Sequence, residues 1–372
     1  MHRRHLLGGF FAAPAALALP ARAGEVRSAP DEALDAVFAS TAPPALAGAM
    51  VTRAGLSWSG VRGARQAGGD QPVTLQDRWH IGSNTKAMTA AVFARLVEAG
   101  RAHWEMTVAE AFPGLTLDPV WPATPLTTLM RHRSGLADAD VIGMDWLGVA
   151  RADPRSLPAQ RAALAAKAFG RPPSGAAGAF AYSNAGYIIV GAAIEAITGQ
   201  AWEDVIRAEL FQPLGLSSAG FGPPPDPNAW GHRTVGGQPL PVNPASPGAD
   251  NPLALGPAGT AHMTLADNAR WLQAVLGGGP QGWLGDDSLT RLTRTDEADP
   301  AYAPGWIIRP APAAGDMGRT IGHEGSNTLW HAMVVAAPDR GLGFIACSND
   351  AAKGAMACRR LIQRLMAVAS AA

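Results

Sequence analysis

Ser83 and Lys86 form the first pair of residues in this sequence whose types and spacing suggest chemistry. They lie three residues apart, where a short apolar run ends and a stretch with few helix breakers, 87–98, is expected to form a helix. This spacing places the lysine amine beside the serine hydroxyl on one helix face. A serine attacks a carbonyl only when a base takes its proton, and a lysine can do this only in its neutral form. Burial and the positive end of the helix both favour that form.

The composition gives this lysine more weight. Only three of the 30 basic residues are lysines, and arginine cannot replace lysine as a base because it does not deprotonate. The simpler alternative is that Ser83 only caps the helix and that Lys86 is a solvated side chain. Two further motifs bear on this choice.

The second motif, Tyr182-Ser183-Asn184, directly precedes a strongly apolar stretch, 185–198, that is expected to be helical. A phenol beside a buried ammonium can transfer protons, because the nearby charge favours its ionised form. An asparagine amide can orient a lysine or a substrate carbonyl, since it both donates and accepts hydrogen bonds. The alternative is a packed ring followed by a helix cap.

The third motif, His323-Glu324-Gly325-Ser326, follows a predicted strand. Gly325 would let a ligand approach the backbone closely, and the backbone N–H of Ser326, with that of Ser83, would stabilise a developing oxyanion. The alternative is a strand edge with a surface histidine and a solvated glutamate.

The elements that must position these motifs divide the chain into two strand-rich ends and a helical middle. Strands are expected at 47–53, 56–64, 306–309, 319–322, 329–337 and 342–348, and further helices at 31–40, 159–169, 202–210, 265–276, 288–294 and 352–368. This order predicts an α/β fold of the α+β type, with an antiparallel sheet built from both chain ends (about 24–82 and 305–372) and flanked by helices. A mainly helical region, about 83–304, is inserted between them. The stretch 223–257, rich in Pro and Gly, is expected to be a long loop at the mouth of the site.

The first 23 residues are expected to be a signal peptide outside the fold. Arg3 and Arg4 precede an apolar stretch too short to span a bilayer, and a small-residue cleavage site follows at 21–23. The paired arginines suggest the twin-arginine route. We therefore expect an exported, periplasmic or secreted protein without a stable membrane anchor, starting near Gly24 and forming one domain over 24–372. An uncleaved anchor is the alternative.

The charge balance argues against a nucleic-acid partner. Without the three arginines of the predicted leader, 27 basic residues face 30 acidic ones, and the basic residues form no cluster that would follow phosphates. No metal-ligand spacing is present and no cofactor is expected. Cys347 and Cys358 are interpreted as two buried thiols, with a disulfide as the alternative.

Taken together and in this order, the three motifs resemble those of the serine β-lactamase and penicillin-binding-protein superfamily. The similarity is greatest to the branch of class C β-lactamases, DD-peptidases and related esterases, and it extends over about 31–368. The fragments 129–136, 211–216 and 257–260 are similar as well.

This resemblance implies a β-lactamase/transpeptidase-like fold and an acyl-enzyme mechanism. Ser83 would be the acylated nucleophile and Lys86 its base, while Tyr182 would pass the proton to the leaving group. Asn184 would hold the acyl side chain and Lys86. The backbone amides of Ser83 and Ser326 would bind the oxyanion.

The third motif departs from the class C β-lactamase pattern. His323 stands where those enzymes carry a lysine near the Tyr182 phenol, and Glu324 replaces a threonine. A Glu324 carboxylate inside the pocket would repel a substrate carboxylate and select neutral or amine-bearing substrates; on a strand, its alternative is to face away. Histidine at this place occurs in DD-peptidase, D-aminopeptidase and esterase relatives.

We therefore expect a peptidase or esterase, with a class C-like β-lactamase as the alternative. The substrate would be a small molecule or peptide: a cell-wall peptide, an ester or a β-lactam. A catalytically silent receptor for cell-wall fragments on the same fold is a further hypothesis, against which the full set of catalytic residues argues. An α/β-hydrolase is disfavoured because no Gly-x-Ser-x-Gly motif is present.

Overall fold

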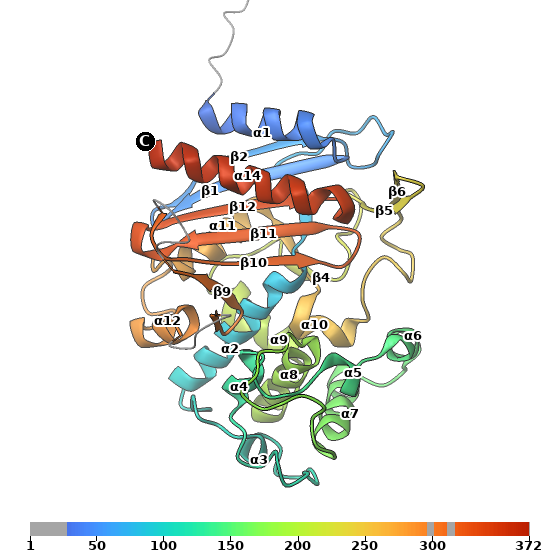
Figure 1. The fold of residues 1–372 in the computed structure, drawn as a ribbon, viewed down its shortest axis with the longest axis vertical. Coiled ribbons are helices and arrows are strands. Elements are labelled where there is room, and N and C mark those ends of the chain that lie inside the picture. Colours follow the sequence, from blue (N-terminus) through green and yellow to red (C-terminus); the bar gives the residue numbers. More distant parts are fainter. Residues whose placement is uncertain (1–27, 296–300, 311–316, 372) are drawn as a thin grey trace, which may run out of the picture.

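A computed structural model describes residues 28–295, 301–310 and 317–371. Its centre is a seven-stranded antiparallel sheet in the order β2-β1-β12-β11-β10-β9-β8, so strands from both chain ends lie side by side (Figure 1). The strands are β1 (Ala45–Thr52), β2 (Gly55–Gly63), β8 (Tyr302–Ala303), β9 (Trp306–Arg309), β10 (Thr320–Ser326), β11 (His331–Ala337) and β12 (Leu342–Ser348). The predicted α+β architecture, with a sheet from both ends and a helical insertion, is confirmed.

Two helices from the chain ends, α1 (Ala29–Thr41) and α14 (Ala351–Ala371), cover one face of this sheet (Figure 1). Strand alternation sets which residues they meet, since Phe344 of β12 packs with the helices and its neighbour Ile345 packs on the opposite face. Gly48 makes room for the outer layer, because a methyl group there would lie 2.8 Å from Cδ2 of Leu361.

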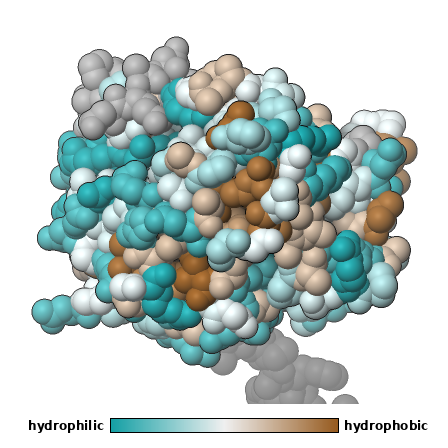
Figure 2. All heavy atoms as spheres, turned by 90° about the horizontal axis from the view of Figure 1, so that it is seen from below, coloured by the Kyte–Doolittle hydropathy of each residue, from teal (hydrophilic) through white to brown (hydrophobic). Residues whose placement is uncertain are grey.

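The opposite face of the sheet packs against the helical region. Its elements are α2 (Thr85–Glu98), α3 (Val108–Ala111), α4 (Leu126–Met130), α5 (Asp138–Val141), α6 (Met144–Ala152), α7 (Leu157–Phe169), α8 (Asn184–Thr198), α9 (Trp202–Ile206), η2 (Arg207–Phe211), α10 (Gly256–Gly259), α11 (Leu265–Val275) and α12 (Asp286–Thr293). Helix α2 is buried on nearly all sides and contacts α8 and α10. Seen from the side of this region, the surface is a mosaic of hydrophilic and hydrophobic areas (Figure 2).

The stretch 223–257 differs from the predicted long loop. It contains a hairpin of β5 (Gly231–Val235) and β6 (Gln238–Val242), followed by the short helix η3 (Leu253–Leu255). The hairpin turns at Gly236-Gly237, both with positive φ, and a Gly-Gly turn of this kind is a sequence marker that the prediction missed. A small sheet of β3 (Arg78–His80), β7 (Ala261–Thr264) and β4 (Gly220–Phe221) was also not predicted.

Cys347 and Cys358 are both buried and unbonded, so the interpretation as two thiols is confirmed. The predicted leader, 1–23, lies outside the described residues. Among the helices that the structure does describe, none combines the length and the apolar character needed to cross a membrane.

Leu361 tests the packing of α14 on the sheet, because its side chain is fully buried in the outer layer. Leu361→Ala should lower the free energy of unfolding by about 2–5 kcal/mol, since it leaves a cavity in a packed core. Urea denaturation followed by circular dichroism measures this. Met356→Ala, at a 45 % exposed position of the same helix, is the matched control and should change stability by less than about 0.5 kcal/mol. Equal effects of the two variants would contradict this packing.

Candidate active site

A cavity of about 570 Å³ lies between the helical region and the end of β10. Four of the predicted site residues line it, namely Ser83, Tyr182, Asn184 and Ser326, together with Asp138. The structure therefore brings residues from all three motifs to one cavity, although they are separated by up to 243 positions in the chain.

Ser83 lies in η1 (Gly82–Asn84), a tight turn between β3 and α2 that begins at Gly82 with a φ of +53°. The turn packs directly on the backbone of β10. A methyl group on Gly325 would lie 2.0 Å from the carbonyl oxygen of Ile81 and 2.6 Å from the amide of Ser83. The prediction that Gly325 admits a ligand is therefore wrong: the space beside it is taken by the turn that carries Ser83. The same contact brings the amide of Ser326 close to Gly82, since a methyl group there would lie 2.4 Å away.

The amine of Lys86 is completely buried and has three polar neighbours. Its Nζ lies 3.0 Å from Ser83 Oγ, 2.8 Å from Asn184 Oδ1 and 2.7 Å from the carbonyl oxygen of Ala258. Burial lowers the pKa of Lys86 to about 7, and the charge of Asp138 raises it in the opposite direction. A neutral amine has two N–H groups and one lone pair. Because the amide and carbonyl oxygens can only accept, the N–H groups face them, and the lone pair faces the serine hydroxyl.

Asp138 keeps this arrangement in place, and sequence analysis did not identify it. Its carboxylate accepts hydrogen bonds from Nδ2 of Asn184 (2.9 Å), the Ser183 hydroxyl (3.1 Å) and the amide of Ala185 (2.9 Å). Since a carboxylate only accepts, the amide nitrogen of Asn184 must face Asp138, and its oxygen must face Lys86. The predicted hydrogen bond between Asn184 and Lys86 is therefore oriented by Asp138.

Tyr182 stands over Lys86, whose Nζ lies 4.8 Å from the ring centroid, and its phenol interacts with the Ser83 side chain. Although Tyr182 is 41 % exposed, burial around the phenol raises its pKa above the ordinary value, while the hydrogen bond with Ser83 lowers it. The prediction of a phenol ionised by a nearby ammonium is therefore wrong: burial has the larger effect, and the phenol is protonated at neutral pH.

His323 lies behind Tyr182, with ring centroids 6.1 Å apart. Its Nδ1 is 2.6 Å from the carbonyl oxygen of Glu324, so Nδ1 carries the hydrogen, and its Nε2 lies 3.0 Å from the Tyr302 hydroxyl. Burial lowers the pKa of His323 to about 4, helped by the charge of Lys86, so the ring is neutral. Both ring nitrogens therefore have partners other than the Tyr182 phenol, and His323 places no fixed positive charge beside that phenol.

Glu324 faces away from the cavity, so the hypothesis that it selects substrates is wrong. Neighbouring residues of a strand point to opposite faces, and on β10 the histidine takes the inner one. The Glu324 carboxylate pairs with Arg359 of α14 at 2.8 and 2.9 Å and with His331 at 3.4 Å. The His331 contact, together with Arg359, lowers the pKa of Glu324 to about 2.

A second buried histidine, His132, supports the ring of Tyr182 at a centroid distance of 4.4 Å. Its Nδ1 accepts the amide of Ser183 at 3.1 Å, and burial, then the charge of Lys86, lowers its pKa well below the ordinary value. The sequence placed His132 in a fragment shared with the superfamily but assigned it no role.

The walls of the cavity differ in character. One wall is apolar and includes Ile142, Leu147 and Leu255, whereas Asn251, Asn327 and Thr328 belong to a polar part of the lining. Among the described residues, no lysine or arginine lines this cavity.

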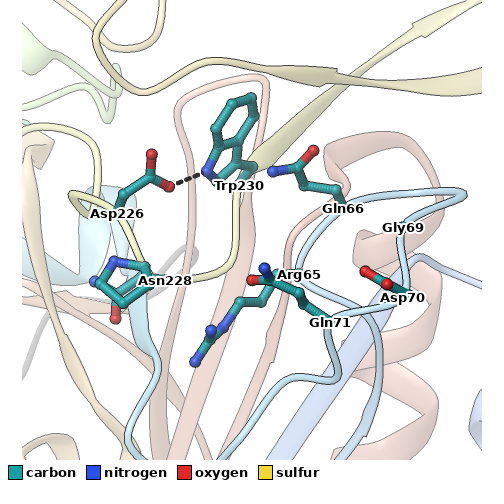
Figure 3. A pocket seen from close by; sticks show the side chains of 9 residues that line it. Arg65, Gln66, Gly69, Asp70, Gln71, Asp226, Asn228 and Trp230 are labelled. Atoms are coloured by element: carbon teal, nitrogen blue, oxygen red, sulfur yellow. Dashed lines mark hydrogen bonds between the residues drawn. The ribbon is translucent and has the colours of Figure 1, made fainter.

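Another cavity, of about 350 Å³, lies under Trp230, whose indole N–H donates to Asp226 (Figure 3). Arg65 lines this cavity, and its guanidinium forms an ion pair with the buried Asp77 at 2.8 Å. Among the described residues no serine lines this cavity, whereas Ser83 lines the larger cavity. Within the described part of the chain, no group of three or more His, Cys, Asp or Glu residues is placed to hold a metal ion.

The family model described as Beta-lactamase matches residues 38–368. Penicillin-binding protein 4 of Amycolatopsis lactamdurans is 34 % identical over 146 residues, which cover 39 % of this chain and 36 % of that protein. Unguisins hydrolase ungD' of Aspergillus campestris (strain IBT 28561) is 26 % identical over 279 residues, covering 70 % of this chain and 48 % of that protein. The chain thus spans less than half the length of these curated relatives.

A solved structure of D-amino acid amidase from Ochrobactrum anthropi SV3, complexed with L-phenylalanine amide, superposes with a TM-score of 0.72 at 19 % identity. The alignment covers 92 % of this chain and 98 % of that chain. At this level of identity the likeness concerns the fold.

The lowered pKa of Lys86 makes stability depend on pH. The folded chain releases this proton at about pH 7, whereas an unfolded lysine keeps it up to about 10.5. The unfolded state therefore binds more protons in this window, and stability rises with pH by ~1.4 kcal/mol per unit from this group. The difference in unfolding free energy between the wild type and Lys86→Met should shift by about 2 kcal/mol in favour of the wild type between pH 7 and 9.

Denaturant titrations at the two pH values measure this difference. Lys167→Met, at an exposed lysine, is the matched control, and its difference from the wild type should be the same at both. A pH-independent difference for Lys86→Met would show that the amine is not held neutral.

Proposed function

We propose that this chain, which belongs to the Beta-lactamase family, is a serine hydrolase that cleaves an amide or ester through an acyl-enzyme on Ser83. The observation that carries the proposal is the orientation of the Lys86 amine. Its N–H groups are used by Asn184 and Ala258, which leaves a lone pair for the hydroxyl 3.0 Å away. This is the arrangement that a base needs to activate a serine.

The reaction needs Ser83, Lys86, Tyr182 and two backbone amides, and Lys86 acts as the base in both halves. Ser83 Oγ attacks the carbonyl carbon while its proton moves to Lys86, and the amides of Ser83 and Ser326 stabilise the oxyanion. The intermediate collapses as the protonated phenol of Tyr182 gives its proton to the leaving nitrogen or oxygen, and the proton on Lys86 restores the phenol. Water, deprotonated by the same base, then cleaves the acyl-enzyme and returns the proton to Ser83.

We infer that the substrate is an amide, peptide or ester without a carboxylate next to the scissile bond, such as a D-amino-acid amide or peptide. Three features support this. The described lining has no lysine or arginine that would bind a carboxylate, the residue at the third motif is a neutral His323, and Ile142 and Leu147 offer an apolar wall for an acyl side chain. A structural neighbour is named a D-amino acid amidase. A class C-like β-lactamase is the second candidate, favoured by the family match.

The test is intact-mass spectrometry with a fluorophosphonate, followed by turnover of a D-amino-acid amide, a p-nitrophenyl ester and nitrocefin. We expect one adduct, mapped to Ser83, and none in Ser83→Ala. Lys86→Arg should lower kcat at least ~100-fold, because arginine cannot accept the proton.

Ser59→Ala, at a serine in β2 outside the cavity, is the control and should label like the wild type. A wild type that forms no adduct would contradict the proposed function, and would favour a silent binding protein. Nitrocefin as the fastest substrate would move the assignment to a β-lactamase.

We also propose that the protein is exported as a single-domain enzyme. The support is the arginine pair followed by an apolar stretch and small residues. Expression in a bacterium with a twin-arginine translocase should give a periplasmic protein whose N-terminal sequence starts near Gly24. Replacing Arg3 and Arg4 by lysine should retain it in the cytoplasm, and export of that variant at the wild-type level would contradict the twin-arginine route.

A further inference from the structure

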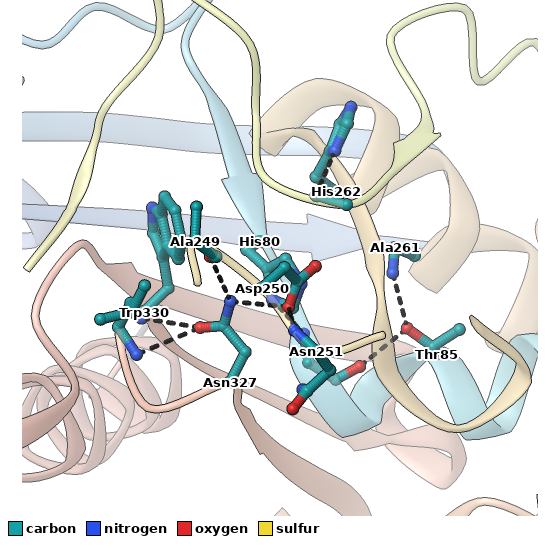
Figure 4. Close-up of polar contacts among 12 residues, drawn as sticks. His80, Thr85, Ala249, Asp250, Asn251, Ala261, His262, Asn327 and Trp330 are labelled. Carbon is teal, nitrogen blue, oxygen red and sulfur yellow. Dashed lines mark hydrogen bonds and ion pairs between the residues drawn. The ribbon is translucent and has the colours of Figure 1, made fainter. Parts of the chain in front are cut away.

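Asp250 is a buried carboxylate that none of the proposed reaction steps uses. It lies between β6 and η3, directly before Asn251, which lines the active-site cavity. Figure 4 shows Asp250 between the strand that leads to Ser83 and the turn that follows β10.

Both oxygens of Asp250 are used. Oδ2 lies 2.9 Å from Nε2 of His80, and Oδ1 accepts from Nδ2 of Asn327 at 2.8 Å and from the amide of Asn251 at 2.7 Å. The carbonyl oxygen of Asp250 accepts from Arg151 of α6 at 2.9 Å. One residue thus joins four segments around the cavity.

The first branch leads to the nucleophile. Because a carboxylate only accepts, His80 Nε2 must carry the hydrogen, which leaves Nδ1 as an acceptor. That nitrogen accepts the amide of Gly82 at 3.2 Å, and Gly82 precedes Ser83. His80 is buried and stacks on Trp330 at a centroid distance of 5.7 Å, so its ring is fixed. Asp250 therefore sets the hydrogen-bonding form of a histidine that holds the turn of the nucleophile.

The second branch leads to the other amide of the proposed oxyanion site. Asn327 directly follows Ser326, and its Oδ1 accepts the amides of Leu329 (3.2 Å) and Trp330 (3.1 Å). Its Nδ2 must therefore face an acceptor, and Asp250 supplies one. This amide closes the turn between β10 and β11 just beyond Ser326.

We propose that Asp250 is a positioning residue for the proposed hydrolysis: through His80 and Asn327 it fixes the two backbone amides that would bind the oxyanion. The inference rests on the proposed function, because it presumes that the amides of Ser83 and Ser326 stabilise a transition state. Such donors act only when they are held at the place where the charge develops.

Asp250→Asn tests the proposal with almost no change in shape. An asparagine has one acceptor oxygen and one donor nitrogen, so it cannot accept from both His80 and Asn327. Either His80 or Asn327 must therefore reorient or lose its hydrogen bond to residue 250. We expect kcat for an ester substrate to fall about 10- to 100-fold with KM changed less than about threefold, since the substrate's ground state makes no contact with Asp250. The inhibition constant of a boronic acid, which forms a tetrahedral adduct on the serine, should rise by the same factor as kcat/KM falls.

His262→Gln is the matched control. His262 is also buried and lies opposite His80 in the β3–β7 pairing, but it hydrogen-bonds the carbonyl of Gly222 (2.8 Å). The His262→Gln variant should have a lower melting temperature than the wild type and a kcat/KM within about twofold of the wild-type value. If Asp250→Asn does not fold, Asn327→Ser takes its place. This variant removes only the hydrogen bonds of the second branch, and its kcat should fall about fivefold or more.

The outcomes separate the two proposals. A wild type that a fluorophosphonate does not label at Ser83 overturns the proposed function. If the wild type is labelled, three results for a folded Asp250→Asn variant would overturn the inference alone. These are an unchanged kcat/KM, a change in KM with kcat unchanged, and a loss of kcat/KM no greater than that of His262→Gln. A loss of kcat that the boronic acid inhibition constant follows supports the inference.

Discussion

The site depends on keeping one lysine amine out of water. Removing an ammonium from water costs more than any neutral hydrogen bond returns, so burial shifts Lys86 towards its neutral form. Three segments are needed for this: α2 carries the lysine through the core, α8 presents Asn184, and α10 presents the carbonyl of Ala258. The amine therefore has polar partners although it is shielded from solvent. The amine thus has a defined orientation as well as a lowered pKa, and proton transfer needs both.

A second constraint joins the helical region to the sheet. The turn that carries Ser83 lies against β10 at a distance that only glycines permit, at Gly82 on one side and Gly325 on the other. Close approach of two backbones brings amides from distant parts of the chain together without flexible side chains. The turn is also supported from behind, because the amide of Gly82 donates to His80. The hydrogen bonds through Asp250 supply that support, and they pass through buried groups whose orientations fix one another.

Much of this was predictable where the sequence carries a local pattern. The strand Leu342–Ser348 and the helix of Asn184 were predicted within a residue, because each is a continuous apolar run whose length fits its element. Strands of two to four residues, such as β3, have too few residues for a period to show. Asp138 and Asp250 were missed for another reason. Each is a single acidic residue outside any motif, and its partners lie 46 and 170 positions away, so only the folded chain shows the contacts.

The error over Glu324 shows how strand register determines the charge of the cavity. On β10, His323 and Glu324 are neighbours, so one must point inward and the other outward. The outward face meets α14, where Arg359 gives the carboxylate two hydrogen bonds that the inner face lacks. The inward face is closed by Tyr302 and Tyr182, which suits a neutral ring and would leave a carboxylate unpaired. The same register thus removes a negative charge from the cavity and leaves no cation in its place. Together with the absence of a lysine or arginine among the described lining residues, this register is the physical basis of the proposed preference for substrates without a carboxylate at this position.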